Sequence, residues 1–207
     1  MSVLETWLTV LVLGWLAMMS PGPNFAMTLR NSLLRSREAG VFTVLGIALG
    51  GLFHISYSLI GVSLLLARSE TLFMALKWAG AAYLVYIGIR AVLTRGSEIT
   101  VEGGATQPMS RAEALRSGFL TCLLNPKSLL FFFAIFTQAV QPDTPLFARL
   151  LIAGTITFEQ LTWYGSVALF FSHKGVRSFF ARAALWLERT TGAAMILLGI
   201  RLALTQS

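Results

Sequence analysis

Residues 41–66 read VFTVLGIALGGLFHISYSLIGVSLLL and contain no Asp, Glu, Lys or Arg. Because an α-helix rises about 1.5 Å per residue, about 20 such residues cross the roughly 30 Å hydrocarbon core of a bilayer. The whole chain has the same character, with 56% hydrophobic and 12% charged residues. A soluble domain carries about 25% charged residues. The sequence therefore predicts an all-α membrane protein embedded in the lipid bilayer.

Further apolar stretches predict six transmembrane helices in a single transmembrane domain that covers residues 1–207. We place these spans near residues 3–19, 41–66, 72–93, 118–140, 146–171 and 186–204. The loops after the first, third and fifth spans contain most of the basic residues, namely Arg30, Arg35, Arg37, Arg90, Arg95, Arg111, Arg116, Lys174, Arg177, Arg182 and Arg189. Short loops rich in Lys and Arg stay in the cytoplasm. We therefore expect both termini to lie outside the cytoplasm.

The charge and the motif content exclude several classes of function. A net charge of +7 would suit nucleic-acid binding only if the basic residues formed an exposed face on a soluble domain. They lie between apolar spans instead, so we expect no nucleic-acid partner. The single cysteine, Cys122, excludes an internal disulfide framework. The sequence contains no H-E-x-x-H, phosphate-loop or G-x-S-x-G motif, so we predict neither an enzyme nor a metal or cofactor site.

A segment at about residues 96–109, rich in Gly and ending near Pro108, reads as a cytoplasmic linker between two halves of three spans each. The halves cover about residues 1–95 and 110–207. Each opens with an S-x-x-E capping box, a common start signal of helices, formed by Ser2 with Glu5 and by Ser110 with Glu113.

A shift of 104 residues superposes glycines of the two halves, namely Gly14 on Gly118, Gly50 on Gly154, Gly61 on Gly165 and Gly88 on Gly192. A repeat with an odd number of spans must lie inverted in the membrane relative to its copy. Many transporters are built from inverted repeats and hold the substrate between them. The sequence therefore predicts two inverted three-helix repeats.

Each half also contains a proline motif within or at the end of an apolar run. The first is Ser20-Pro21-Gly22-Pro23-Asn24 and the second is Asn125-Pro126-Lys127. Proline removes a backbone donor and biases the preceding residue away from helical geometry, and glycine adds conformational freedom. We predict a broken helix at both motifs, with a plain turn at the first and a proline kink at the second as alternatives. Backbone freed in this way is tolerated at membrane depth only beside protein or a water-filled cavity.

These motifs, together with Gly46 and Gly50 in the second span, resemble the LysE/RhtB family of bacterial amino-acid exporters over essentially the whole chain. Residues 158–163, FEQLTW, resemble its threonine and homoserine branch. The resemblance implies amino-acid efflux across the bacterial inner membrane, driven by the proton gradient. It also implies a transport framework made of Pro21, Gly22, Pro23, Asn24, Asn125, Pro126 and Lys127.

Three ionisable residues, His54, Lys127 and Glu159, lie near the middle of predicted spans. Burying Lys or Glu without a partner costs roughly 3 kcal/mol on insertion scales, so each should face a partner or a cavity. Helical spacing places Glu159 and His54 each in a stripe of polar and small residues, so two such stripes could line one aqueous path. These stripes are Thr155, Glu159, Thr162 and Ser166 in the fifth span, and Thr43, Gly46, Gly50, His54, Tyr57 and Gly61 in the second.

We predict that Glu159 couples transport to protons, with His54 as the second candidate. The alternatives are a fixed ion pair between Glu159 and Lys127, and a His54 that only hydrogen-bonds a neighbouring helix. Gly46 and Gly50 form a G-x-x-x-G motif, which more often serves close helix packing than ligand binding.

The leading hypothesis is a secondary exporter of neutral amino acids whose partners are the amino acid and protons. A substrate carboxylate can meet the positive end of a half-helix or Lys127, and its ammonium can meet freed carbonyls or Glu159. One alternative is a transporter of another small solute, such as a cation or a homoserine-lactone-like molecule. Another is a membrane scaffold or sensor that does not transport. A homodimer also remains open.

Overall fold

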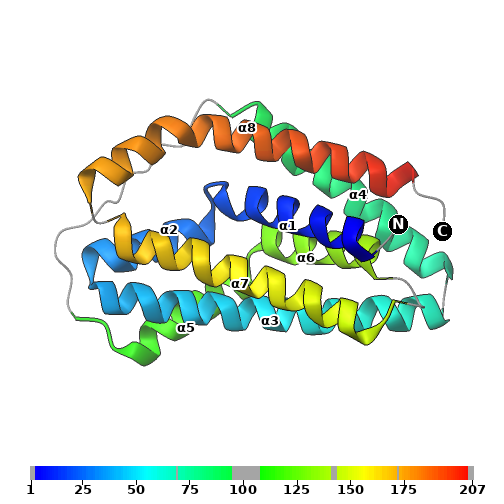
Figure 1. Cartoon of the computed structure of the whole chain (residues 1–207), viewed down its shortest axis with the longest axis horizontal. Helices are drawn as coiled ribbons and strands as arrows, with labels where there is room; N and C mark the ends of the chain where they lie inside the picture. The colour runs from blue at the N-terminus through cyan, green and yellow to red at the C-terminus, as the bar shows by residue number, and fades with distance from the viewer. Residues whose placement is uncertain (1–2, 69, 95–107, 141–143, 172, 205–207) are drawn as a thin grey trace.

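The computed structural model describes residues 3–68, 70–94, 108–140, 144–171 and 173–204, and these residues fold into helices only. The helices run roughly along one common direction (Figure 1). They are α1 (Val3–Met19), α2 (Pro23–Leu34), α3 (Arg37–Arg68), α4 (Glu70–Val92), α5 (Arg111–Leu123), α6 (Pro126–Ala139), α7 (Leu146–Phe170) and α8 (Lys174–Leu204). The predicted linker and the first predicted capping box, which includes Ser2, lie outside the described residues.

Both proline motifs break a helix, as predicted. The axes of α1 and α2 meet at 53°, and those of α5 and α6 meet at 60°. Gly22 is extended, with φ −172° and ψ −176°, and Pro23 begins α2. Asn125 is also extended, and its side chain accepts a hydrogen bond of 3.0 Å from the Lys127 backbone N–H. Proline without a donor is tolerated in the first turn of a helix, so each motif ends one helix and starts another.

The lengths of the apolar helices support a membrane location. Within the described residues, Arg37–Ile60 of α3 and Arg182–Arg201 of α8 are each long and apolar enough to cross a bilayer. The pairs α1 with α2 and α5 with α6 reach that length and hydropathy only together, which raises the number of candidate spans from two to at most four. α4 contributes a shorter apolar stretch, Trp78–Val92.

Two predicted span boundaries differ from the observed helices. The predicted fourth span, residues 118–140, is interrupted, and its first piece begins earlier, at Arg111, because the Ser110 and Glu113 capping box starts α5 there. The predicted sixth span, residues 186–204, is the C-terminal part of α8, which begins at Lys174.

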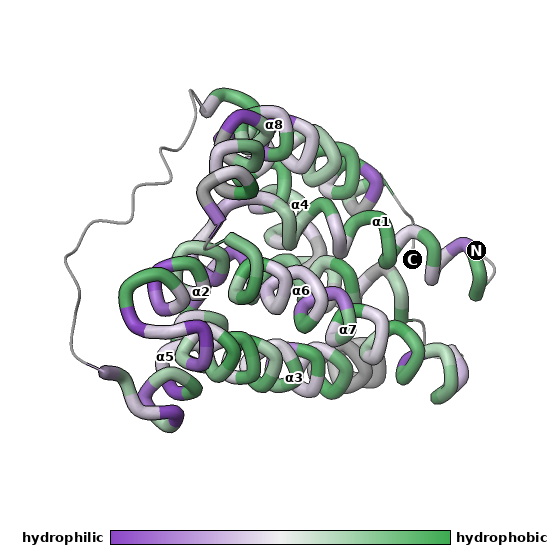
Figure 2. Tube along the Cα trace, turned by 60° about the vertical axis from the view of Figure 1, so that its left-hand side comes forward, coloured by the Kyte–Doolittle hydropathy of each residue, from purple (hydrophilic) through white to green (hydrophobic). Residues whose placement is uncertain are grey.

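The outer face of α3 is apolar along its length. Leu45, Leu49, Leu52, Phe53 and Ile60 are all exposed. In Figure 2, hydrophobic residues dominate α3, and hydrophilic ones gather at the end of the molecule where α2 and α5 lie. A long exposed apolar face with polar residues collected at one end suits a lipid environment better than water.

Glycines let α3 and α5 approach closely. A Cβ on Gly46 would collide with the Leu115 carbonyl, and one on Gly118 would collide with the Thr43 carbonyl. The same pairing of small residue and backbone allows close helix crossings in membranes. The structure therefore favours the packing interpretation of the G-x-x-x-G motif.

The helices are arranged as a central group around α3 and a separate pair formed by α4 and α8. α3 packs mainly against α5, α7 and α2, whereas α4 and α8 pack mainly against each other. The α4 and α8 pair lies along one side of the central group (Figure 1). At the crossing of this pair, a Cβ on Gly88 would meet the Gly192 carbonyl, and a Cβ on Gly192 would meet the Gly88 carbonyl.

Candidate functional site

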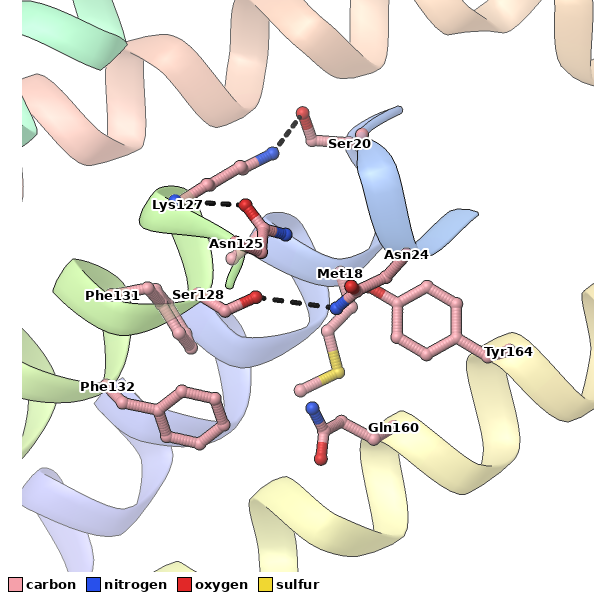
Figure 3. Close-up of a pocket in the computed structure, with 12 residues that line it drawn as sticks. Met18, Ser20, Asn24, Asn125, Lys127, Ser128, Phe131, Phe132, Gln160 and Tyr164 are labelled. Atoms are coloured by element: carbon pink, nitrogen blue, oxygen red, sulfur yellow. Dashed lines mark hydrogen bonds between the residues drawn. The ribbon is translucent and has the colours of Figure 1, made fainter. Parts of the chain in front are cut away.

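A cavity of about 40 Å³ lies where the two helix breaks meet. It is lined by Ala17, Met18, Ser20, Gly22, Asn24, Asn125, Lys127, Ser128, Phe131, Phe132, Gln160 and Tyr164, which come from both breaks and from α7 (Figure 3). A buried water needs about 10–15 Å³ of such volume, so the cavity has room for a few water molecules. Four residues of the predicted framework, Gly22, Asn24, Asn125 and Lys127, line it. The prolines 21, 23 and 126 shape the breaks but do not line the cavity.

Lys127 joins the two breaks. It stands in the first turn of α6, and its Nζ donates a hydrogen bond of 2.8 Å to Ser20 Oγ at the end of α1 (Figure 3). Lys127 is the one charged residue among those lining the cavity. Its ammonium is therefore the main fixed charge that a solute in the cavity would meet.

Amide and hydroxyl groups supply the remaining polarity. Asn24 Nδ2 donates a hydrogen bond of 3.4 Å to Ser128 Oγ across the cavity. Gln160 Oε1 is buried and has no hydrogen-bond partner among the described residues. Unpaired buried acceptors are costly. The Gln160 oxygen lies against Gly51 of α3, and the amide nitrogen is turned toward the cavity (Figure 3). Asn24 Oδ1 is also buried without a hydrogen-bond partner among the described residues, so it is a ready acceptor for a donor on a bound solute.

Glu159 lies directly behind this wall, next to Gln160 in α7. Its side chain is fully buried, and neither carboxyl oxygen has a hydrogen-bond partner among the described residues. The carboxyl group presses against Gly14 of α1, where an added Cβ would collide with it. Lys127 is therefore not paired with Glu159 in the described part of the chain, and its Nζ donates to Ser20 instead. The fixed-pair alternative therefore lacks a contact to support it.

His54 is fully buried and both ring nitrogens have partners. Nδ1 lies 2.7 Å from the Tyr57 hydroxyl and Nε2 lies 2.9 Å from the Cys122 carbonyl. Pro126 cannot donate to that carbonyl, so the imidazole replaces part of the missing helix hydrogen bonding. The ring also stacks on Phe132, with centroids 5.3 Å apart. These contacts favour the structural interpretation of His54.

The two expected polar stripes do not line one path. In α7, Glu159 is buried whereas Thr162 is exposed. Thr155 accepts a hydrogen bond of 2.9 Å from the Trp7 indole, which ties α7 to α1. Thr43 accepts one of 2.9 Å from Asn31 Nδ2 within a buried network. Helical spacing correctly grouped these residues by direction, but neighbouring helices cover them differently.

Sequence reasoning missed Ser20, Ser128, Gln160, Tyr164 and a buried acidic residue of α8, Glu188. One signal was available for Ser128, which lies 104 residues after Asn24, the offset that the glycines share. Gln160 and Tyr164 lie one helical turn apart in α7, but nothing in the sequence distinguishes their face from that of Thr162. Glu188 stands beside Arg189 near the start of an expected span, and nothing in the sequence there indicates burial.

Comparison with known proteins adds independent information. The family described as LysE type translocator matches residues 15–206. The threonine efflux protein of Escherichia coli K12 is 30% identical over 207 residues, which cover 99% of this chain and 100% of that protein. The homoserine/homoserine lactone efflux protein of Salmonella typhimurium is 34% identical over 153 residues, 74% of this chain and 73% of that protein. No solved structure matches the chain.

Proposed function

Because the chain belongs to the family of LysE type translocators, we propose that it exports neutral amino acids of the threonine and homoserine type by proton antiport. The family and the named relatives make the chain a helical membrane transporter of the amino-acid efflux family and not an enzyme. The observation that carries the finer proposal is the cavity between the two helix breaks, with the Lys127 ammonium and the unpaired amide oxygen of Asn24.

One side of the cavity suits a carboxylate. Gly22 provides no side-chain cap to α2, so the positive end of that helix is open. The Lys127 ammonium lies 4.0 Å from the position that a Cβ on Gly22 would occupy. A half-helix N-terminus beside a cation is a favourable site for a substrate carboxylate.

The other side suits an ammonium and a hydroxyl. Asn24 Oδ1 offers a buried acceptor without a hydrogen-bond partner among the described residues, and the Ser128 hydroxyl offers a group that can bond a substrate hydroxyl. The lining residues include no Asp or Glu. A solute with a net positive charge would therefore meet Lys127 without a compensating carboxylate. This argues for zwitterions and against the cation-transport alternative.

Binding requires the cavity to widen. Pockets for small ligands usually enclose about 300–1,000 Å³, far more than the space between the breaks. The uncapped α2 and the hinge at Gly22 are the elements through which such widening can occur with little loss of helix hydrogen bonding.

Glu159 is the proposed proton carrier. An ionised carboxylate buried without hydrogen bonds is strongly disfavoured, so Glu159 is more stable with a proton in the described arrangement. An opening of α1 away from α7 would bring water to it and let the proton leave. His54 is the weaker candidate because both its nitrogens are already engaged.

The proposal includes six spans in two inverted repeats. Adding 104 to the bounds of α1 to α4 gives 107–123, 127–138, 141–172 and 174–196, close to α5, α6, α7 and α8. The contacts of Gly88 with Gly192 and of Asn24 with Ser128 join positions at this same offset, as a local twofold axis requires. We also propose that the protein lies in the bacterial inner membrane with both termini outside the cytoplasm, and leave a homodimer open.

Counterflow in proteoliposomes tests the function. Vesicles loaded with unlabelled threonine should accumulate labelled threonine and homoserine, and lysine should compete poorly because the cavity has a cation and no carboxylate. A failure of every amino acid to exchange would remove the proposed function. Uptake of a small cation instead would support the other transporter hypothesis.

A further inference from the structure

α8 touches the first helix break through a defined polar contact. Thr191 Oγ1 donates a hydrogen bond of 2.7 Å to the Leu16 carbonyl in the last turn of α1. Ser20 follows in the break, and its backbone N–H donates to the same carbonyl at 3.3 Å. This contact therefore links α8 to the point where the chain leaves α1.

Glu188 lies one helical turn before Thr191, so both side chains project from the same face of α8. Glu188 is 7% exposed. Thr191 reaches the Leu16 carbonyl, which also accepts from the Ser20 backbone N–H. The Ser20 hydroxyl accepts from the Lys127 ammonium, so this face of α8 is turned toward Lys127 of α6. Figure 3 shows the Lys127 and Ser20 side chains on the side of the cavity that faces the α8 ribbon. The ends of α1 and α6 and the middle of α8 therefore meet at one polar cluster.

Lys127 then has two roles that compete. It is the only charged residue lining the cavity, and it is also the cation that faces Glu188. A buried carboxylate needs a compensating charge. A substrate carboxylate at Lys127 would supply the same interaction from inside the cavity and weaken the one from α8.

We propose that Glu188 is the resident counter-charge of Lys127, that a substrate carboxylate displaces it, and that this exchange releases α8 from the helix breaks. The inference rests on the proposed function, because it assumes that a carboxylate-bearing solute enters the cavity. α4 and α8 contact each other more extensively than they contact the central helices. The pair can therefore move as a unit once the contacts of Glu188 and Thr191 are broken. A ligand shifts such an equilibrium only by binding the two states differently, and competition for Lys127 provides that difference.

Two variants measure the competition. Glu188→Gln removes the competing charge, so the half-saturating concentration of threonine in counterflow should fall about threefold to tenfold, the worth of a partly buried ion pair. Glu38→Gln is the matched control, since it removes a carboxylate that pairs with Arg111 at the exposed end of α3. It should leave half-saturation unchanged. Glu188→Asp keeps the charge but shortens its reach, and should shift half-saturation in the same direction by a smaller factor.

Cysteine labelling gives a readout that does not depend on transport rates. Thr191 is 1% exposed, so Thr191→Cys should react slowly with a maleimide in the otherwise unchanged protein and faster with saturating threonine. In the Glu188→Gln background it should react fast without threonine. The inference is overturned if threonine exchanges normally but changes neither the labelling rate nor, in Glu188→Gln and Glu188→Asp, the half-saturation. If the unaltered protein exchanges no amino acid, the proposed function fails first.

Discussion

Asn24 and Ser128 bond to each other across the cavity, Nδ2 to Oγ at 3.4 Å, although 104 residues separate them in the chain. The proposed inverted repeats account for this contact, because positions at the repeat offset would meet near the axis that relates the halves. In that proposal each half contributes an equivalent wall to one site. Lys127 breaks this equivalence, because the position 104 residues before it is Pro23.

Lys127→Met should weaken substrate binding. A hydrogen bond to a charged group is worth about 1.5–3 kcal/mol, which corresponds to roughly 10-fold to 100-fold in half-saturating concentration. Threonine counterflow over a concentration series measures this. Lys127→Arg should retain part of the affinity because it keeps the charge, and Arg116→Met, at an exposed position of α5, is the control. Equal affinity in Lys127→Met and the parent protein would exclude a carboxylate site at the ammonium.

Glu159→Gln should separate exchange from pumping. Glutamine keeps the size of the side chain but cannot carry a proton, so exchange at equal threonine concentrations should persist while proton-driven export stops. Proteoliposomes with and without an imposed pH gradient distinguish the two activities. Pumping against a threonine gradient by the variant would show that Glu159 is structural.

His54→Gln is the companion experiment. The change disturbs the hydrogen bonds to Tyr57 and Cys122, so it should lower the free energy of unfolding by about 1–3 kcal/mol and leave proton coupling intact. Thermal unfolding in detergent and the same pH-gradient assay measure the two effects. If His54→Gln lost proton coupling while Glu159→Gln kept it, His54 would be the proton carrier and Glu159 would be structural.

The effect of a Gly→Ala substitution on stability should depend on the space around the added methyl group. Gly118→Ala would drive a methyl group into the backbone of α3 and should destabilise by about 1–3 kcal/mol or more. Gly14→Ala meets the Glu159 side chain, which can shift, so its cost should be smaller and it should also impair coupling. Gly154→Ala and Gly165→Ala have nothing within 4 Å of the new methyl group, and alanine should there be neutral or stabilising by up to about 1 kcal/mol. Unfolding midpoints test this ranking, and a destabilised Gly154→Ala would contradict it.

Single cysteines should report the orientation. Ser36 and Ser110 are exposed at the end of the molecule that is rich in Arg, and Pro145 is exposed at the start of α7. Each can be replaced by cysteine in turn. In intact cells an impermeant maleimide should label Pro145→Cys and spare the other two until the membrane is opened. The native Cys122 is buried, so it should contribute little background. The reverse pattern would place both termini in the cytoplasm.

The start of α5 should lose stability in acid. Hydrogen bonds from the Ser110 backbone and hydroxyl hold the pKa of Glu113 below its ordinary value. Because the pKa of Glu113 is lowered in the folded state, its ionised carboxylate stabilises the helix start at pH values above the ordinary pKa of Glu. That stabilisation is lost as the pH falls through the lowered pKa. Amide hydrogen exchange of residues 111–114, corrected for intrinsic rates, should show reduced protection in acid. Glu113→Gln should remove this pH dependence, and an unchanged profile would exclude the capping box as its source.

Features that depend on local backbone chemistry could be predicted from the sequence. The two breaks follow from the prolines, and the α5 start follows from Ser110 and Glu113, because these effects act within a few residues. The involvement of Asn24, Asn125 and Lys127 in one cavity was also anticipated, since their backbone had to face protein or water.

Features that depend on the packing of distant helices could not be predicted. Whether α7 turns Gln160 or Thr162 toward the cavity is decided by the contacts of α7 with α1 and α3. The partner of His54 is a carbonyl in α5, and the hydrogen-bond partner of the Lys127 ammonium is the Ser20 hydroxyl at the end of α1. In both cases the sequence identified a residue that needs a partner but contained nothing that names it.

The crossing of α4 and α8 constrains how this protein can change over generations. A Cβ added at Gly88 or at Gly192 would collide with the carbonyl oxygen of the other glycine, so a methyl group at either position forces the same two helices apart. Once the first has done so, the second enters space that is already open, and neighbouring substitutions of this kind are not additive. The second replacement is then milder than the first. A lineage that loses one of these glycines therefore has little remaining selection to keep the other, and the two should persist or disappear together.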